Sequence, residues 1–183
     1  MILIPEPVQG LPPLRKVATA THHTLFLTRD GQVYSCGRGE DGRLGHGDGK
    51  NYDSPKLIEA LASLPHGDRI VDVNCGETHS LVTSAQGRLY SFGYGDLLQL
   101  GNGVEEDVMK PYCLQSKEID EMGAAGLGRA VVQAAGGAQH SIILTVERTK
   151  PAPWAKAPAA GAGAPAAAAA ASSSSSAAAA GAQ

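Results

Sequence analysis

Six histidines are the side chains of this sequence best suited to chemistry near neutral pH. They are His22, His23, His46, His66, His79 and His140. Imidazole nitrogens bind metal ions and transfer protons, but each role needs partner residues at a defined spacing. The sequence contains no H-E-x-x-H motif, no Cys/His ligand spacing and no arrangement typical of a Ser/His/Asp triad. The spacing therefore favours no metal centre, no cofactor and no bond-making enzyme.

A glycine-rich segment, residues 37–42, matches the G-x-G-x-x-G pattern that can bind dinucleotide phosphates. That chemistry needs a helix to begin at the motif, so that its amide dipoles face the pyrophosphate. Residues 43–49 contain three further glycines and cannot form that helix. A later copy of the segment has Leu98 in place of the third glycine. We therefore interpret these glycines as turn residues between two strands.

The three cysteines, Cys36, Cys75 and Cys113, form no C-x-x-C pair and are odd in number. This argues for a reducing compartment and against a disulfide framework. Two of them align with Phe92 and Leu57 in the repeat described next. A position that exchanges Cys for a large apolar residue is typical of a core, so we expect no catalytic thiol.

The histidines and glycines recur along the chain. Residues 17–55 match residues 73–111 at an offset of 56, and a third unit begins at an offset of 61. The repeated structural positions are His79 and Gly31, Gly37, Gly45, Gly76, Gly87, Gly93, Gly101 and Gly137. His23 and His140 share the position of His79, where one histidine in each unit favours a buried hydrogen-bonding role over a ligand role. His22 lies outside that position.

Each unit contains short apolar runs separated by turn residues, which predicts β-strands. In the first unit we expect strands at residues 17–19, 24–27, 32–36 and 57–58, and in the second the last strand at 113–114. Helix is expected only at residues 58–64 and 117–122. Four short strands in about 50 residues are typical of a propeller blade. We therefore predict an all-β chain, a partial β-propeller of about two and a half four-stranded antiparallel blades.

These patterns divide the chain into five parts. They are the end of a preceding blade (1–16), repeat 1 (17–72), repeat 2 (73–128), the start of a closing repeat (129–150) and a disordered Ala/Pro/Ser-rich tail (151–183).

The formal net charge of −3 argues against general nucleic-acid binding. An early Pro-Glu-Pro sequence and the lack of a ~20-residue apolar run argue against secretion and membrane insertion. Glu105, Glu106 and Asp107 are either a solvated loop or a contact for a basic partner.

The repeat resembles that of the regulator of chromosome condensation superfamily, over about residues 5–146. The resemblance lies in the sequences T-H-H-T (21–24), D-G-Q-V-Y-S-C-G (30–37) and G-R-L-G-H-G (42–47). Residues 93–101 and 136–144 resemble the last blades of the founding member of the family. Ala20 departs from the motif, which has glycine there, so we expect an altered turn before His23.

The resemblance implies a seven-bladed propeller that catalyses nucleotide exchange on the Ran GTPase by a non-covalent mechanism. It implies that His22 or His23, together with His140, contact the GTPase, and that the opposite face meets the nucleosome. Nuclear, chromatin-bound localisation follows from the resemblance alone; the residues otherwise indicate the cytoplasm. No membrane or small-molecule partner is expected. The alternative is a non-catalytic propeller-repeat scaffold for protein–protein interaction.

The resemblance also implies that much of the propeller is missing. The wedge loop that displaces the nucleotide and the main chromatin-contacting loops belong to earlier blades of the family. Residues 131–146 would form the inner strands of a ring-closing blade. An open arc of this kind leaves unpaired strand edges, which favour aggregation or pairing with another chain.

Overall fold

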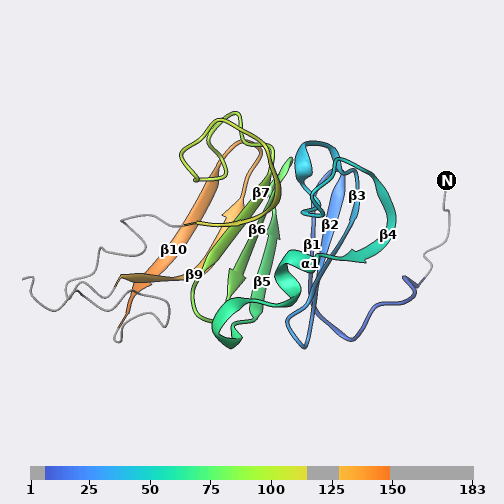
Figure 1. The fold of residues 1–183 in the computed structure, drawn as a ribbon, viewed down its shortest axis with the longest axis horizontal. Helices are drawn as coiled ribbons and strands as arrows, with labels where there is room; N and C mark the ends of the chain where they lie inside the picture. The colour runs from blue at the N-terminus through green and yellow to red at the C-terminus, as the bar shows by residue number, and fades with distance from the viewer. Residues whose placement is uncertain (1–6, 115–127, 149–183) are drawn as a thin grey trace, which may run out of the picture.

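The computed structural model describes residues 7–114 and 128–148, which form short antiparallel strands in three sheets (Figure 1). The first sheet has the order β1-β2-β3-β4, so that each strand pairs with its neighbour in sequence. Its strands are β1 (Leu14–Thr19), β2 (His23–Thr28), β3 (Val33–Gly37) and β4 (Tyr52–Leu57). This is the predicted four-stranded blade.

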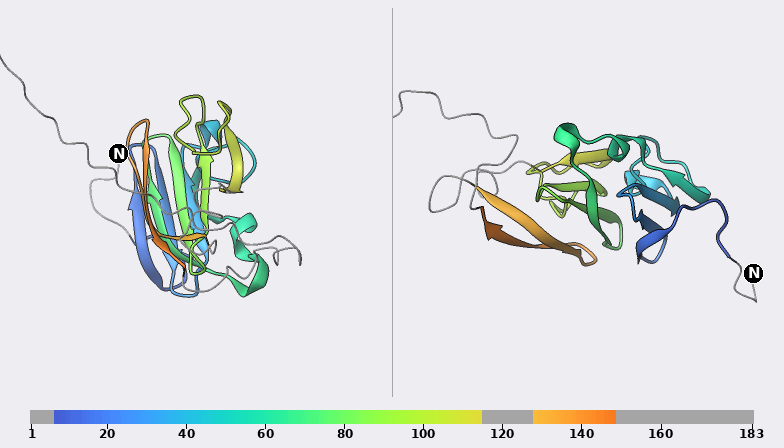
Figure 2. Two further views of the ribbon diagram at one scale, coloured as in Figure 1. Left: turned by 90° about the vertical axis from the view of Figure 1, so that its left-hand side faces the viewer. Right: turned by 90° about the horizontal axis from the view of Figure 1, so that it is seen from below.

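The second sheet repeats the first, and the third is a two-stranded continuation. The second contains β5 (Ile70–Cys75), β6 (His79–Ser84), β7 (Leu89–Gly93) and β8 (Val108–Cys113). The third contains β9 (Arg129–Gly136) and β10 (Ser141–Glu147). Figure 2 shows the three sheets side by side. The prediction of an all-β, partial propeller is confirmed.

The fourth strand of each blade lies earlier in the sequence than predicted. β4 and β8 end at Leu57 and Cys113, where the prediction had them begin. Both strands contain a proline, at 55 and 111, and proline donates no ladder hydrogen bond. Both strands are the outermost of their sheets, pairing with β3 and β7 alone, and a missing donor is tolerated at such an edge.

The predicted helix at residues 58–64 is a single turn, α1 (Glu59–Ala62). Ser63 leaves the helical region and Pro65 opens a separate 3-10 turn (Pro65–Gly67), so a second α-helical turn is not formed. The helix expected at 117–122 and the tail at 151–183 lie outside the described residues. No helix of the described part has the length and hydropathy of a membrane span.

Apolar side chains between the sheets hold the blades together. Leu25 and Leu27 of the first blade share a core cluster with Val73 and Phe92 of the second, and all four are fully buried. A second cluster joins β6 and β7 to β9. Gly45 is needed at the first interface, because a Cβ there would lie 2.9 Å from the Phe92 ring. The blades are therefore stabilised mainly by contact with their neighbours.

Candidate interaction face

The loops that carry the candidate residues all lie at one end of the blades, which we call the loop face (upper end in Figure 1). It comprises residues 20–22, 38–51, 76–78, 94–107 and 137–140. Backbone hydrogen bonds join these loops in pairs: the Arg38 N–H donates to the His22 carbonyl at 2.8 Å, and the Tyr94 N–H to the Thr78 carbonyl at 3.1 Å. The loops thus extend from fixed strand ends.

His23 links the first blade to the second below this face. Its Nε2 lies 3.0 Å from the Ser80 hydroxyl, which itself donates to the Arg43 carbonyl at 2.8 Å. The Ser80 hydroxyl has one proton and donates it to the Arg43 carbonyl, so it can only accept a hydrogen bond from His23. The Nε2 of His23 must therefore be protonated. Its buried Nδ1 has no partner among the described residues. Burial, with Arg43 nearby, lowers the pKa of His23 to about 4.

His79 makes the same link between the second blade and β10. Its Nε2 lies 2.9 Å from the Ser141 hydroxyl, which donates to the Gln99 carbonyl at 2.7 Å. Burial is the main cause that lowers the pKa of His79 to about 4. His140 holds the corresponding place in the third sheet but is exposed. A neutral histidine bonded to a serine of the next blade is therefore a repeated structural device, which we call the blade link.

The departure at Ala20 does not alter the turn before His23. The Ala20 N–H donates to the His23 carbonyl at 2.9 Å, as the Gly76 N–H does to His79 at 2.8 Å. The expectation of an altered turn is wrong in this respect. The glycine has a separate role in the second blade, where a Cβ on Gly76 would lie 2.1 Å from the His79 ring.

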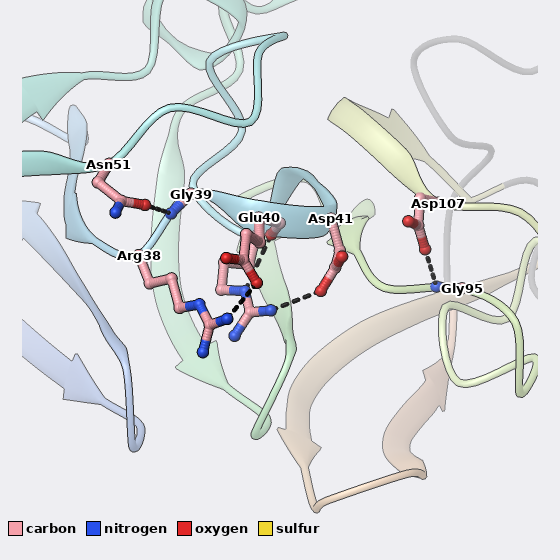
Figure 3. Close-up of polar contacts among 8 residues, drawn as sticks. Arg38, Gly39, Glu40, Asp41, Asn51, Gly95 and Asp107 are labelled. Carbon is pink, nitrogen blue, oxygen red and sulfur yellow. Dashed lines mark hydrogen bonds and ion pairs between the residues drawn. The ribbon is translucent and has the colours of Figure 1, made fainter.

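In each of the long β3–β4 and β7–β8 loops, a side-chain oxygen from the end of the loop accepts a backbone N–H from its start (Figure 3). The Asn51 Oδ1 accepts the Gly39 N–H at 2.9 Å, and the Asp107 Oδ1 accepts the Gly95 N–H at 3.0 Å. Sequence analysis missed this role, although the offset of 56 places Asn51 over Asp107 and would have revealed it. One of the three acidic residues of the 105–107 cluster is therefore structural.

Acidic side chains from both blades meet on the loop face. Asp41 belongs to the first blade and is paired with Arg43, whose side chain is 4 % exposed. Burial raises the pKa of Asp107, and Asp41 and Asp96 raise it further. Asp96 is also the main cause of the raised pKa of Tyr94. Asp41, Asp96 and Asp107 therefore form an acidic patch that crosses the blade boundary.

We expect the substitution Asp107→Asn to stabilise the chain by about 0.5 kcal/mol, within the range of exposed charge pairs. The amide oxygen can accept the Gly95 N–H as Asn51 does in the first blade, while the repulsion from Asp41 and Asp96 is removed. Urea unfolding at pH 7 measures the change. A lower unfolding free energy would show that the carboxylate itself is needed at this turn.

The other candidates of the sequence analysis are placed as follows. His22 is exposed on the loop face, whereas His23 is 2 % exposed. The G-x-G-x-x-G segment contains only a three-residue turn, Glu40–Gly42, with Asp41 at a positive φ of 58°. Burial raises the pKa of Cys75 to about 12, which suppresses thiolate chemistry. Within 7–114 and 128–148, no group of three His, Cys, Asp or Glu is arranged to hold a metal.

Comparison with known proteins identifies the repeat. The family model described as "Regulator of chromosome condensation (RCC1) repeat" matches residues 30–83 and 86–144, and a second model of that description matches 15–43 and 70–99. The E3 ubiquitin-protein ligase HERC2 of Mus musculus is 41 % identical over 60 % of this chain and 2 % of its own length. The regulator of chromosome condensation of Drosophila melanogaster is 37 % identical over 72 % of this chain and 22 % of its own.

A solved structure has a fold similar to that of this chain. The structure of Prp20p from Saccharomyces cerevisiae, whose title reports binding to Gsp1p and histones, matches 80 % of this chain with a TM-score of 0.60 and 24 % identity. The match covers 33 % of Prp20p, so this chain spans a third or less of these relatives. With matching repeats over more than half of its length, the chain belongs to the regulator of chromosome condensation (RCC1) repeat family.

Proposed function

We propose that this chain is the C-terminal portion of a guanine nucleotide exchange factor for a Ran-type GTPase. The exchange needs no covalent step: a surface that binds the nucleotide-free GTPase more tightly than the loaded form speeds nucleotide release. The proposal is supported by the similarity to the Drosophila regulator and by the Gsp1p binding named for Prp20p. The parts proposed to act are repeat 1 (17–72), repeat 2 (73–128) and the start of the closing repeat (129–150).

The observation that carries the proposal is the placement of His22. Its side chain is exposed on the loop face, while its carbonyl is held by the Arg38 N–H at 2.8 Å. The backbone therefore presents this imidazole from a fixed position, which reduces the ordering cost of binding. Of the other two histidines implied by the resemblance, His23 is buried in a blade link and His140 occupies the position of a blade link. We therefore assign the GTPase contact to His22.

The proposal also includes a chromatin partner and a nuclear location. A GTPase on the loop face leaves the opposite ends of the blades free for the nucleosome, and histone binding is named for Prp20p. We therefore propose a nuclear, chromatin-bound protein with a protein partner on each face. The acidic patch would face the GTPase and would select a basic surface on it.

A chimera tests this function. Residues 7–148 replace the matching blades of the Drosophila regulator, so that the ring is complete, and release of a fluorescent guanine nucleotide from Ran is followed. We expect His22→Ala to slow release about tenfold, the effect of losing a contact worth between 1 and 2 kcal/mol. The matched control is His66→Asn, because His66 is exposed at the opposite end of the blade and Asn tolerates its φ of 60°. Equal rates for His22→Ala and His66→Asn would remove His22 from the contact.

The alternative, a propeller-repeat scaffold without exchange activity, is favoured by the 41 % identity to HERC2, an E3 ubiquitin-protein ligase. The two functions differ in one result. A scaffold chimera would fold and bind protein partners without changing nucleotide release from Ran. An exchange factor would accelerate that release.

A further inference from the structure

A pocket of about 360 Å³ lies between the first two blades, on the outer side of the array. Its walls come from the loop after β3, from β4 and α1, and from β8 of the second blade. β4 and β8 are the outermost strands of their sheets, and Figure 2 (right) shows them with α1 along one side of the array. Further blades of a ring would pack on the other faces of these two sheets and leave the pocket open. We call it the rim pocket, and its lining residues are Gly45, His46, Lys56, Glu59, Ala60 and Lys110.

Lys56 is held at the rim pocket by Tyr52. Its Nζ donates to the Tyr52 hydroxyl at 2.8 Å and lies 4.2 Å from the centroid of the ring. The Tyr52 hydroxyl in turn donates to the Asp48 carboxylate at 3.1 Å. The hydrogen bond to Tyr52 is the main cause of the raised pKa of Lys56, and Asp48 and Glu59 raise it further. The charge of Lys56 is therefore balanced in part by acidic neighbours.

Lys110 reaches the same pocket from the second blade without such a neighbour. Its side chain packs over Gly47, where a Cβ would collide with the Lys110 Cε. Within residues 7–114 and 128–148, Lys110 makes no hydrogen bond and no ion pair. The rim pocket therefore contains one lysine with a fixed stem and an uncompensated charge.

His46 supplies a hydrogen-bond acceptor on the wall of the pocket. Its Nε2 lies 2.9 Å from the Ser35 hydroxyl, which donates to the Leu44 carbonyl at 2.7 Å. As in the blade link, Nε2 must therefore carry a proton, which leaves Nδ1 as an acceptor. Burial is the main cause that lowers the pKa of His46, so its imidazole is neutral at pH 7.

The second unit of the repeat has different side chains at these positions. At the offset of 56 it has Asn102, Val104, Val108 and Tyr112 in place of His46, Asp48, Tyr52 and Lys56. Its long loop is nevertheless closed by the same bond, with Asp107 in the place of Asn51. A blade of this fold therefore forms without the residues of the rim pocket, which indicates that they have a role other than folding.

We propose that the rim pocket binds the carboxylate of an acidic side chain, Asp or Glu, in a peptide segment of a partner protein. Lys56, Lys110 and Glu59 together carry a net charge of +1, which one carboxylate neutralises. Lys110 donates charge-assisted hydrogen bonds to that carboxylate, and His46 Nδ1 accepts a backbone N–H of the peptide.

The side chains of the pocket are already held by Tyr52, Ser35 and Gly47, so binding orders few rotamers. A phosphate dianion fits less well, because its charge exceeds the net charge of the lining. This inference is independent of the proposed exchange function, because it uses neither His22 nor the acidic patch.

NMR of ¹⁵N-labelled residues 1–183 tests the pocket, with the tripeptide acetyl-Gly-Glu-Gly-amide as the probe. We expect saturable shifts of the backbone amides of residues 45–47, 56–60 and 109–110, which form or adjoin the lining. The same peptide with Gln in place of Glu should leave these amides unchanged at equal concentration. Lys110→Met keeps the apolar stem over Gly47 but removes the charge, so it should weaken binding of the Glu peptide about fivefold. Lys110→Arg, which keeps the charge, should retain most of the affinity.

The matched control is Lys50→Met, since Lys50 is an exposed lysine of the same loop but does not line the pocket. It should bind the Glu peptide like the unchanged chain, and the dispersion of the amide spectrum reports whether each variant is folded. Equal shifts with the Gln peptide, or unchanged affinity of Lys110→Met, would overturn the proposal. A phosphoserine tripeptide that binds more tightly than the Glu peptide would also overturn it, because phosphate would then be the preferred ligand.

Discussion

Acidification from pH 7 to pH 4 is expected to lower the unfolding free energy by about 3 kcal/mol for each of His23 and His79. The figure is the drop in pKa from 6.5 to about 4 in the folded chain, converted at about 1.4 kcal/mol per pH unit. The physical cause is the blade link. Nε2 already donates to a serine, so an added proton must sit on a buried Nδ1 that has no acceptor among the described residues.

The sign of this change in unfolding free energy depends on whether the folded or the unfolded chain binds the proton at the higher pH. The unfolded chain protonates these histidines near pH 6.5, whereas the folded chain resists protonation until about pH 4. Their contribution to stability is therefore complete above pH 6.5 and is lost as the pH falls toward 4. Because both links join neighbouring blades, we expect the blades to separate in this interval.

Urea unfolding at pH 7, 5.5 and 4 measures the effect, and two variants identify its source. His79→Gln keeps a donor for Ser141 but has no group that titrates here, so its unfolding free energy should fall about half as much as that of the unchanged chain. Val104→Ala, at an exposed loop position without a titratable group, should leave the pH dependence unchanged. If His79→Gln and the unchanged chain lost the same free energy, the blade links would not be the acid-sensitive element.

Gly39→Ala is expected to destabilise the chain by about 3 kcal/mol and to lower its melting temperature by roughly 10 °C. The cause is steric, because Gly39 has an ordinary φ of −100°. A Cβ there would lie 1.8 Å from the Lys50 carbonyl oxygen, so the two arms of the 38–51 loop would have to separate. The bond from the Gly39 N–H to Asn51 would be lost with them.

Gly49→Ala is the matched control, since it lies in the same loop and its Cβ would meet nothing closer than 3.9 Å. It should change the melting temperature by a degree or two at most. Gly95→Ala should behave like Gly39→Ala, because its Cβ would lie 1.8 Å from the Glu106 carbonyl oxygen. Thermal denaturation of the three variants measures the effect. Similar melting temperatures for Gly39→Ala and Gly49→Ala would show that the two arms of the 38–51 loop can separate at little cost.

The repeat made the blade architecture predictable from the sequence. His23 over His79 and Gly37 over Gly93 fix the register between units, and apolar runs with glycine turns define the first three strands. The fourth strand was misplaced because Pro55 and Pro111 look like strand breakers until the strand is known to be an edge. That information lies in the sheet order, which a local pattern does not contain.

The candidate site was less predictable, because its contacts cross blade boundaries. The repeat distinguishes His23 from its neighbour His22, but it does not reveal the partner of His23, which is Ser80, 57 residues away in the next blade. The acidic patch likewise joins Asp41 to Asp107 from different units. Such proximity depends on how two blades pack and not on spacing within either one.

The most direct test of the central claim compares two proteins in the same assay of nucleotide release from Ran. One is the completed chimera that contains residues 7–148, and the other is the chain of residues 1–183 alone. We expect the chimera to accelerate release by orders of magnitude over the spontaneous rate, whereas residues 1–183 alone, which span a third or less of these relatives, should not. A folded chimera without effect would contradict the exchange function, and full activity of the isolated chain would contradict the role assigned to the missing blades.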